Sequence, residues 1–337
     1  GDTLLTLLND ILDFSKIEAG KFELESLNFN LRDTVTNTVR TLSARAAEKD
    51  IELACRIAPE IPQMMTGDPG RLRQIIVNLV GNAIKFTDQG EVFVNVELQS
   101  VDDDSVSLKF SVNDTGIGIP QEKQSNVFHA FEQVDASTTR RFGGTGLGLS
   151  ISSQLVKMMR GESWLESEVN EGTTFYFTAT FDPASEQVSR PLAQLDQFEG
   201  MRVLVVDDNK TNRRILEEVL SSWNMQPVMA ESGSAGLAEL YRGVHEKSPI
   251  RLILLDYMMP GMNGFQFAEL VRANPDFDDC VMIMISSAVR AGDTARCRSL
   301  NIVRCMAKPV KQSELLDTIL AQFDLSPLDE EFAGAAV

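Results

Sequence analysis

Asp114-Thr-Gly-Ile-Gly-Ile-Pro120 and Gly143-Gly-Thr-Gly-Leu-Gly-Leu-Ser150 are two glycine-rich segments, and both lie downstream of Asn78-Leu-Val-Gly-Asn-Ala-Ile-Lys-Phe86. Glycine lets a backbone approach a ligand closely and offer its N–H groups to phosphate oxygens. One glycine cluster alone is weak evidence. The asparagine-containing segment followed by the two glycine-rich segments, in this order, predicts that the first half of the chain binds a phosphate-bearing ligand.

The second half of the chain repeats a simpler pattern, in which an apolar stretch ends at a polar residue. From Met201 onward, predicted strands and helices alternate five times, which indicates a doubly wound parallel sheet, a (βα)5 fold. Ligands of such sheets bind beyond the carboxyl ends of the strands. The polar residues expected at that edge are Asp207, Asp208, Asp256, Ser286 and Lys308.

Three carboxylates in one place repel one another unless a cation joins them, and Mg²⁺ is the natural choice. We therefore expect Asp207, Asp208 and Asp256 to hold Mg²⁺ beside a phosphoryl group. In this arrangement one carboxylate is the nucleophile, while Ser286 and Lys308 hold the remaining phosphate oxygens. The alternative, unrelated polar residues that happen to end strands, requires four coincidences.

Length and composition limit the possible classes of protein. A chain of 337 residues predicts two or three domains, and its 43% hydrophobic residues suffice for ordinary cores. The net charge of −18 argues against nonspecific nucleic-acid binding, which needs a basic surface. The cysteines form no CxxC pair, so we expect reduced thiols of a cytosolic protein at Cys55, Cys280, Cys297 and Cys305.

Hydrophobic periodicity divides the chain into parts. Residues 3–19 predict an amphipathic helix that needs partner helices. Residues 28–182 mix helices with strands and predict an α/β sandwich with a mostly antiparallel sheet. Residues 183–199 predict a linker and 327–337 a frayed tail. Within the sandwich, helices are expected from Asn30 to Lys49, from Pro69 to Phe86 and from Leu147 to Met159, and strands over 92–98, 106–113, 164–167 and 173–180.

The segment from Asn78 to Phe86 places Asn78, Asn82 and Lys85 on one side of a predicted helix. Asparagine oxygens suit Mg²⁺, and lysine suits a phosphate. A solvated polar stripe is the alternative.

Asp114 ends a predicted strand, where its carboxylate can accept a hydrogen bond from the exocyclic amine of adenine. Gly116 and Gly118 would let the backbone close over the base. A plain Asp-Thr-Gly turn is the alternative there.

The second glycine-rich segment leads directly into a predicted helix. Gly144, Gly146 and Gly148 precede or begin that helix, whose N-terminal N–H groups favour anions such as a triphosphate. Arg140 and Arg141 would add positive charge to a mobile lid. Interpreting the segment as a flexible surface loop does not exclude a lid, because a lid must also be flexible.

These segments resemble the N, G1, F and G2 boxes of bacterial histidine kinases, with Phe128 and Phe131 in the F box and Glu171-Gly-Thr-Thr-Phe175 as a last glycine box. Asp10–Gly20 resembles the second helix of the dimerisation hairpin, which assigns residues 1–27 to a truncated hairpin. The resemblance implies an ATPase sandwich of the histidine-kinase and gyrase type, with Asn78 as a Mg²⁺ ligand. The ATP-binding residues it implies are Asn78, Asn82, Lys85, Phe86, Asp114, Gly116, Gly118, Arg140, Arg141, Gly144, Thr145, Gly146, Leu147 and Gly148.

Residues 200–326 resemble the receiver domain of response regulators. The resemblance implies that Asp207 and Asp208 are the acidic metal pair and that Asp256 is the phosphorylated aspartate. Ser286 matches the switch hydroxyl, and Lys308-Pro309 matches the lysine–proline step, whose peptide is cis in the family. Receivers usually carry Tyr or Phe three residues before the lysine, where this chain has Cys305.

The histidine that the family phosphorylates is missing from the sequence. The chain has two histidines, His129 and His245, and neither has the family's His-Glu-x-Arg-Thr-Pro context. We predict the cytoplasmic C-terminal portion of a bacterial hybrid sensor histidine kinase, whose parent is either soluble or membrane-anchored. Mg-ATP would phosphorylate a hairpin histidine upstream, within a homodimer, and Asp256 would then pass the phosphoryl group to a histidine phosphotransfer protein. The alternative is a catalytically silent ATP-binding and receiver module that regulates a partner kinase.

Overall fold

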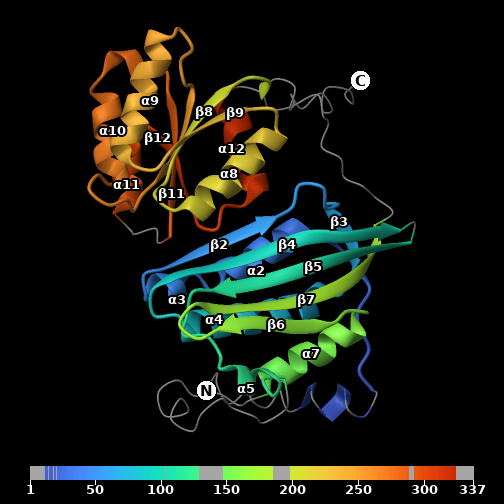
Figure 1. Cartoon of the computed structure of the whole chain (residues 1–337). Coiled ribbons are helices and arrows are strands. Elements are labelled where there is room, and N and C mark those ends of the chain that lie inside the picture. Colours follow the sequence, from blue (N-terminus) through green and yellow to red (C-terminus); the bar gives the residue numbers. More distant parts are fainter. Residues whose placement is uncertain are drawn as a thin grey trace, which may run out of the picture. The chain divides into compact units, whose positions relative to one another are not determined.

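The computed structural model describes residues 12–13, 15–17, 19, 21–102, 104–128, 147–184, 198–287 and 292–323. The chain divides into two compact units, which are described separately: one carries strands β1 to β7 and the other β8 to β12 (Figure 1). Most of the helix predicted over 3–19 lies outside the described residues. Residues 12–13 and 15–17 of it are helical.

The first unit is a sheet with helices on one face. Its sheet has the order β1-β3-β7-β5-β4-β2, and β6 also pairs with β7. Among the described residues, the strand pairs of this sheet are antiparallel except β2 with β4, so the predicted mostly antiparallel sheet is confirmed. The strands are β1 (Leu27–Asn30), β2 (Ile51–Ile57), β3 (Met64–Gly67), β4 (Gly90–Asp102), β5 (Ser105–Asp114), β6 (Ser163–Glu168) and β7 (Gly172–Pro183). The helices are α2 (Leu31–Arg40), α3 (Ser43–Ala47), α4 (Pro69–Phe86), α5 (Gln121–Gln124) and α7 (Gly148–Met158).

Alternation along the strands explains how this unit builds its core. Every second residue of β5, from Val106 to Val112, is buried, while the residues between them are half-buried. The buried side of the sheet packs on the apolar faces of α2, α4 and α7 in one continuous cluster. A strand with one face on the core has an apolar–polar alternation in its sequence, which is why β4, β5 and β7 were predictable.

Helix α4 shows how local sequence sets an element's bounds. Asp68 is its N-cap and accepts a hydrogen bond from the Arg71 N–H at 2.9 Å, and Pro69 occupies the first turn. Proline is favoured there because its missing N–H has no intrahelical partner to lose. The predicted helix from Pro69 to Phe86 is confirmed.

The single helix predicted from Asn30 to Lys49 is wrong, because the structure has α2 and α3 with a break at Thr41 and Leu42. The Thr38 and Thr41 hydroxyls donate to the Thr34 and Thr38 carbonyls at 2.6 and 2.7 Å. Such side-chain bonds compete with the helical ladder and bend helices. The prediction also missed β1, β2 and β3.

The second unit is a doubly wound parallel sheet, as predicted. Its strand order is β12-β11-β10-β8-β9, so the chain winds first to one side of β8 and then to the other. The strands are β8 (Arg202–Val206), β9 (Gln226–Ala230), β10 (Leu252–Asp256), β11 (Val281–Ser286) and β12 (Ile302–Ala307). The helices are α8 (Lys210–Ser222), α9 (Gly233–His245), α10 (Gly264–Arg272), α11 (Asp293–Ser299) and α12 (Gln312–Gln322), with a 3-10 turn, η3, at Pro275–Phe277.

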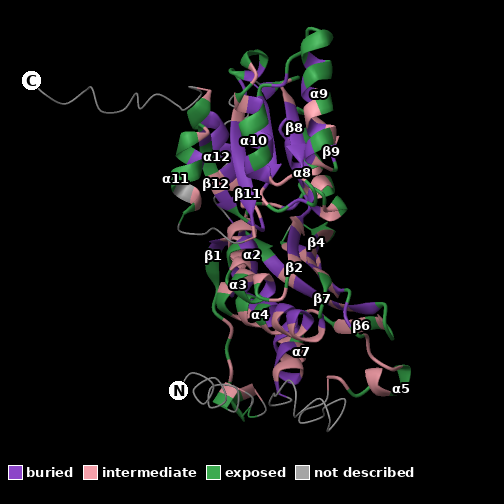
Figure 2. Cartoon of the chain, turned by 90° about the vertical axis from the view of Figure 1, so that its left-hand side faces the viewer, coloured by how far each residue is buried: buried purple, intermediate pink, exposed green. Residues whose placement is uncertain are grey.

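The central strands of this sheet are buried on both faces (Figure 2). In β10, Leu252 and Leu254 pack in a core with α8 and α12, whereas Ile253 and Leu255 pack in a second core with α9 and α10. Two covered faces explain why these strands are continuous apolar runs. Within the described residues, no helix combines the length and the apolarity that a membrane crossing requires.

Candidate functional site

The first candidate site begins on the polar side of α4. Asn78 and Asn82 are half-buried there, and the Asn82 Nδ2 lies 3.5 Å from the Asn78 Oδ1. The opposite side of α4, with Ile75, Ile76, Leu79 and Ala83, is buried in the core, as predicted. The Asn78 Nδ2 donates to the Ser152 Oγ at 2.9 Å, which leaves its amide oxygen as the atom suited to a hard cation such as Mg²⁺.

Helix α7 begins against Asn78. A Cβ on Gly148 would lie 2.3 Å from the Asn78 Oδ1, so any larger residue would force Asn78 or the helix end to move. The N-cap residue, Leu147, supplies no side-chain cap to the first turn of α7. Helix N-terminal N–H groups carry partial positive charge and attract anions. The structure thus brings Asn78 together with the kind of helix end that binds phosphate.

Asp114 ends β5 and is buried, with 4% of its surface exposed. Burial raises its pKa to about 6, although backbone hydrogen bonds from Gly116 and Thr173 act in the opposite direction. The Gly116 N–H donates to the Asp114 Oδ1 at 2.9 Å. A buried carboxyl needs a polar partner, and the turn that follows Asp114 positions this one.

That turn packs on the end of α4. The Ile117 N–H donates to the Phe86 carbonyl at 3.3 Å. Gly118 has a φ of +68° and no room for a Cβ beside the Glu168 carbonyl, so this position requires glycine. Burial lowers the pKa of Lys85, whose Nζ lies 4.8 Å from the centroid of the Phe86 ring. The turn after Asp114 and the end of α4 therefore form one continuous structure.

Several predicted site residues of the first unit lie outside the described residues. They are Arg140, Arg141, Gly144, Thr145 and Gly146. Phe131 of the F-box resemblance and His129 also lie outside the described residues.

The second candidate site is a cluster of carboxylates at the carboxyl end of the parallel sheet. Asp207 and Asp208 follow β8, Asp256 ends β10, and their ligand atoms all lie within 4.8 Å of one another. Asp207 and Asp256 are buried, whereas Asp208 is exposed. Two buried carboxylates this close repel strongly in a low dielectric. An all-oxygen set of this kind fits Mg²⁺, which prefers carboxylates and keeps several waters.

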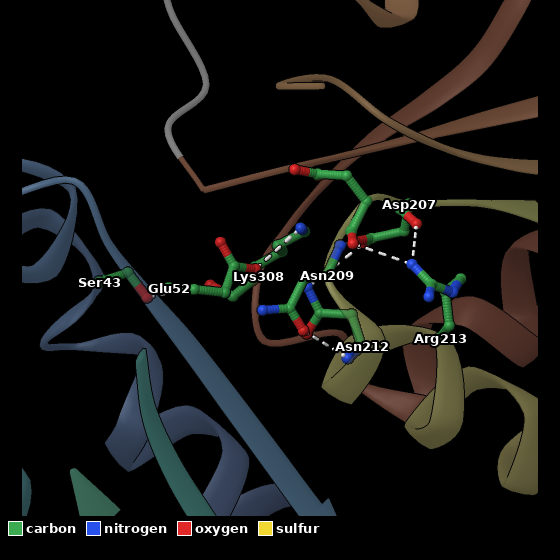
Figure 3. Close-up of polar contacts among 8 residues, drawn as sticks. Ser43, Glu52, Asp207, Asn209, Asn212, Arg213 and Lys308 are labelled. Atoms are coloured by element: carbon green, nitrogen blue, oxygen red, sulfur yellow. Dashed lines mark hydrogen bonds and ion pairs between the residues drawn. The ribbon is translucent and has the colours of Figure 1, made fainter. Parts of the chain in front are cut away.

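Backbone and side-chain contacts hold the acidic pair in place (Figure 3). The Asn209 N–H donates to the Asp207 Oδ1 at 2.8 Å, and the Asn212 Nδ2 lies 3.3 Å from the Asp207 Oδ2. The Arg213 Nη1 donates to the carbonyls of Asp207 and Asp208 at 2.8 and 2.9 Å. Asn209, Asn212 and Arg213 were not predicted from the sequence. The N-cap pattern at Asn209, which accepts from the Asn212 N–H, is the signal that could have drawn attention to them.

Ser286 and Lys308 come from the two strands on the far side of β10. Ser286 ends β11, which pairs with β10 in parallel, and it is buried. Lys308 directly follows β12, the next strand, and the Lys308–Pro309 peptide is cis, as the resemblance implied. The sheet order therefore brings Ser286 and Lys308 to the same edge as the carboxylates. Cys305, on β12, is half-buried, and burial raises the pKa of its thiol to about 12.

Two family models match the chain, one on each unit. Residues 67–183 match the histidine kinase-, DNA gyrase B- and HSP90-like ATPases, and residues 203–320 match the response regulator receiver domain. The first unit is therefore an ATPase domain of the histidine-kinase type, and the second is a receiver. The chain belongs to the hybrid histidine kinases, in which both domains occur in one polypeptide.

Named relatives agree with this assignment. Hybrid signal transduction histidine kinase K of Dictyostelium discoideum is 33% identical over 95% of this chain and 28% of its own length. The signal transduction histidine-protein kinase BarA of Escherichia coli is 41% identical over 69% of the chain and 25% of its own length. Histidine kinase 3 of Arabidopsis thaliana is 31% identical over 95% and 35%, respectively.

A solved structure shares the fold. The crystal structure of full-length ShkA in complex with AMPPNP has a TM-score of 0.59 at 22% identity, covering 96% of this chain and 90% of that one. The chain spans about a third or less of the three curated relatives described above. Those relatives come from bacteria and from eukaryotes, so they do not support the prediction of a specifically bacterial source.

Proposed function

We propose that this chain is the part of a hybrid kinase that takes the γ-phosphoryl group from ATP and later carries it on Asp256. The first unit would bind Mg-ATP and phosphorylate a histidine on the dimerisation hairpin of the parent homodimer. Asp256 would then accept the group and pass it to a histidine phosphotransfer protein. ATP use and the free thiols suit the cytoplasm.

Three features of the first unit support a nucleotide site. Asn78 faces the start of α7, where a helix end without a side-chain cap suits a triphosphate. Asp114 is a buried acceptor suited to the exocyclic amine of adenine. Lys85 and the residues of the glycine-rich lid would hold the phosphates. The fold neighbour ShkA, solved with AMPPNP, supports the same ligand class.

The clustering of Asp207, Asp208 and Asp256 is the observation that carries the proposal for the second unit. A Mg²⁺ ion bound there would neutralise the carboxylates and the incoming phosphoryl oxygens. An Asp256 carboxylate oxygen forms the new bond to phosphorus, giving an acyl phosphate. The bond between phosphorus and the histidine nitrogen breaks, and the imidazole keeps the electron pair. Ser286 and Lys308 hold the phosphoryl oxygens during transfer.

The test supplies the chain with γ-labelled ATP, Mg²⁺ and a separately produced dimerisation hairpin that contains the parent's histidine. We expect an acid-labile label on the hairpin and a base-labile label on this chain. Asp256→Asn should remove only the label on the chain. Asp279→Asn, at an exposed position of the same domain, is the matched control and should change neither label. A base-labile label that survives Asp256→Asn would contradict the assignment.

The same experiment tests the silent-module alternative. The lack of a family-type histidine in the sequence favours that reading for the isolated chain. Tight ATP binding without any label on the hairpin would support the silent module. Label on the hairpin would support the kinase.

A further inference from the structure

Lys49 makes an unusual set of contacts in the first unit. It follows α3, is half-buried, and its Nζ donates to the carbonyls of Ile84, Lys85 and Thr87 at 2.8, 3.0 and 2.9 Å. These three acceptors lie at the C-terminal end of α4, at least 35 positions away in the sequence. One side chain therefore binds the end of the helix that carries the candidate nucleotide residues.

The chemistry of a helix end explains why a lysine suits this place. The last carbonyls of an α-helix have no intrahelical partner and carry partial negative charge. A lysine ammonium offers three donors and a full positive charge. Three carbonyl oxygens at hydrogen-bonding distance match those three donors, so Lys49 acts as a C-terminal cap supplied by a distant segment.

The capped segment is joined to the turn that follows Asp114. The Phe86 carbonyl, between the Lys49 acceptors, accepts from the Ile117 N–H at 3.3 Å. A Cβ on Gly116 would lie 2.5 Å from that same carbonyl oxygen, so the turn packs on it closely. Gly116 in turn donates to the Asp114 Oδ1. A shift of the α4 end would therefore move the turn that positions the Asp114 carboxylate.

We propose that Lys49 is a positioning residue for the nucleotide site, acting through the end of α4 and the 116–117 turn. It sets the affinity for ATP without serving as a ligand of the nucleotide. This inference rests on the proposed function of the first unit. It predicts that loss of the Lys49 ammonium weakens ATP binding by more than its effect on folding explains.

The unit contains a matched control. The Arg32 guanidinium also binds backbone carbonyls from a distant segment, those of Ile57, Ala58 and Ile61, at 2.8 to 3.1 Å. Those carbonyls belong to the end of β2 and the segment after it, which carries none of the candidate nucleotide residues. Replacing Arg32 removes the same kind of contact elsewhere in the same core.

The experiment compares Lys49→Met, Lys49→Arg and Arg32→Met in the full chain. ATP affinity is measured by calorimetry, and unfolding of the first unit by urea titration with hydrogen exchange read on β5 peptides. We expect Lys49→Met to weaken ATP binding at least about fivefold and Lys49→Arg to stay within about twofold of the wild type. Arg32→Met should lower the urea midpoint and leave ATP affinity unchanged.

The outcomes separate the two proposals. If the wild type binds ATP, and Lys49→Met lowers the urea midpoint without lowering the affinity for ATP, the positioning role is overturned and the proposed function stands. If the wild type binds no ATP, the proposed function of the unit is overturned and this inference with it. Lys49→Gln, which keeps a donor at similar length, carries the same comparison if Lys49→Met does not fold.

Discussion

The two candidate sites of this chain are assembled in different ways. The carboxylate cluster of the second unit lies at strand ends, where a parallel sheet brings polar residues to one edge whatever the helices between them contain. The candidate nucleotide site of the first unit depends on side-to-side packing, because Asn78 and Gly148 meet only where α4 and α7 touch. The second site needs a cation to offset charge, whereas the first has one buried carboxyl, Asp114, with a raised pKa. Topology alone predicts one site, and packing decides the other.

Mg²⁺ removal is the strongest test of this contrast. Three carboxylates with ligand atoms within 4.8 Å cannot accept a further anionic group without a cation. We expect EDTA to lower the transfer of label from the phosphorylated hairpin to Asp256 by at least about 100-fold. Excess Mg²⁺ should restore it, and Ca²⁺ at the same concentration serves as the control cation. Transfer that continues at full rate in EDTA would contradict the proposal that the three carboxylates hold Mg²⁺ for phosphoryl transfer.

Asp114→Asn tests the first unit alone. The variant keeps an acceptor for the Gly116 N–H but lacks the ionised carboxylate proposed to accept from adenine. Because a hydrogen bond to a charged group contributes about 1.5–3 kcal/mol, ATP affinity should fall about 10- to 100-fold. Calorimetry measures the affinity, and label transfer from a phosphorylated hairpin to Asp256 should remain as in the wild type.

The same variant should show a pH-dependent gain in stability. Folding raises the Asp114 pKa from 3.8 to about 6, so the folded state binds this proton more tightly than the unfolded state. The stability contributed by the protonated group is present below about pH 4 and is lost as the pH rises through 6. Asp114→Asn should therefore raise the unfolding free energy of the first unit by roughly 1–3 kcal/mol at pH 7 and change it little at pH 4. An equal effect at both pH values would contradict the raised pKa.

Gly148→Ala tests the packing of α7 on α4. The added methyl group would lie 2.3 Å from the Asn78 Oδ1, so the asparagine or the helix end must move. We expect ATP affinity to fall roughly tenfold, since about 1.4 kcal/mol is a typical cost of one displaced polar contact. Gly81→Ala is the matched control, because a Cβ at that position of α4 would meet nothing within 4 Å beyond its chain neighbours and its own helix backbone. An affinity that does not change would separate Gly148 from the site.

Arg213→Met should have the smallest effect. Arg213 holds the carbonyls of Asp207 and Asp208 but contributes no ligand to the cluster. Loss of these two bonds should slow transfer to Asp256 about fivefold, equivalent to about 1 kcal/mol. The neighbouring Arg214, which is exposed and pairs with Glu218, provides the control variant Arg214→Met, with an unchanged rate. Equal transfer rates for both variants would show that the two Arg213 hydrogen bonds are not needed for transfer.

Particular elements show how far the sequence could be interpreted alone. The strands β4, β5 and β7 carry alternating buried positions because one face of the sheet is on the core, and the start of α4 is predictable from Asp68 and Pro69. The short strands β1 and β3 have four residues each, too few for a period to emerge. The break between α2 and α3 depends on threonine hydroxyls turning back to the backbone, which propensity does not reveal.

Local order along the chain determined the two domains, the doubly wound sheet and the types of residue at each candidate site. These properties are written in periodicity, caps and strand ends, which depend on neighbours in the sequence. Tertiary structure alone decided the contacts of Lys49 with α4 and of Gly148 with Asn78. Both contacts join segments 35 or more residues apart, and such distances close only when a buried core holds whole elements against each other.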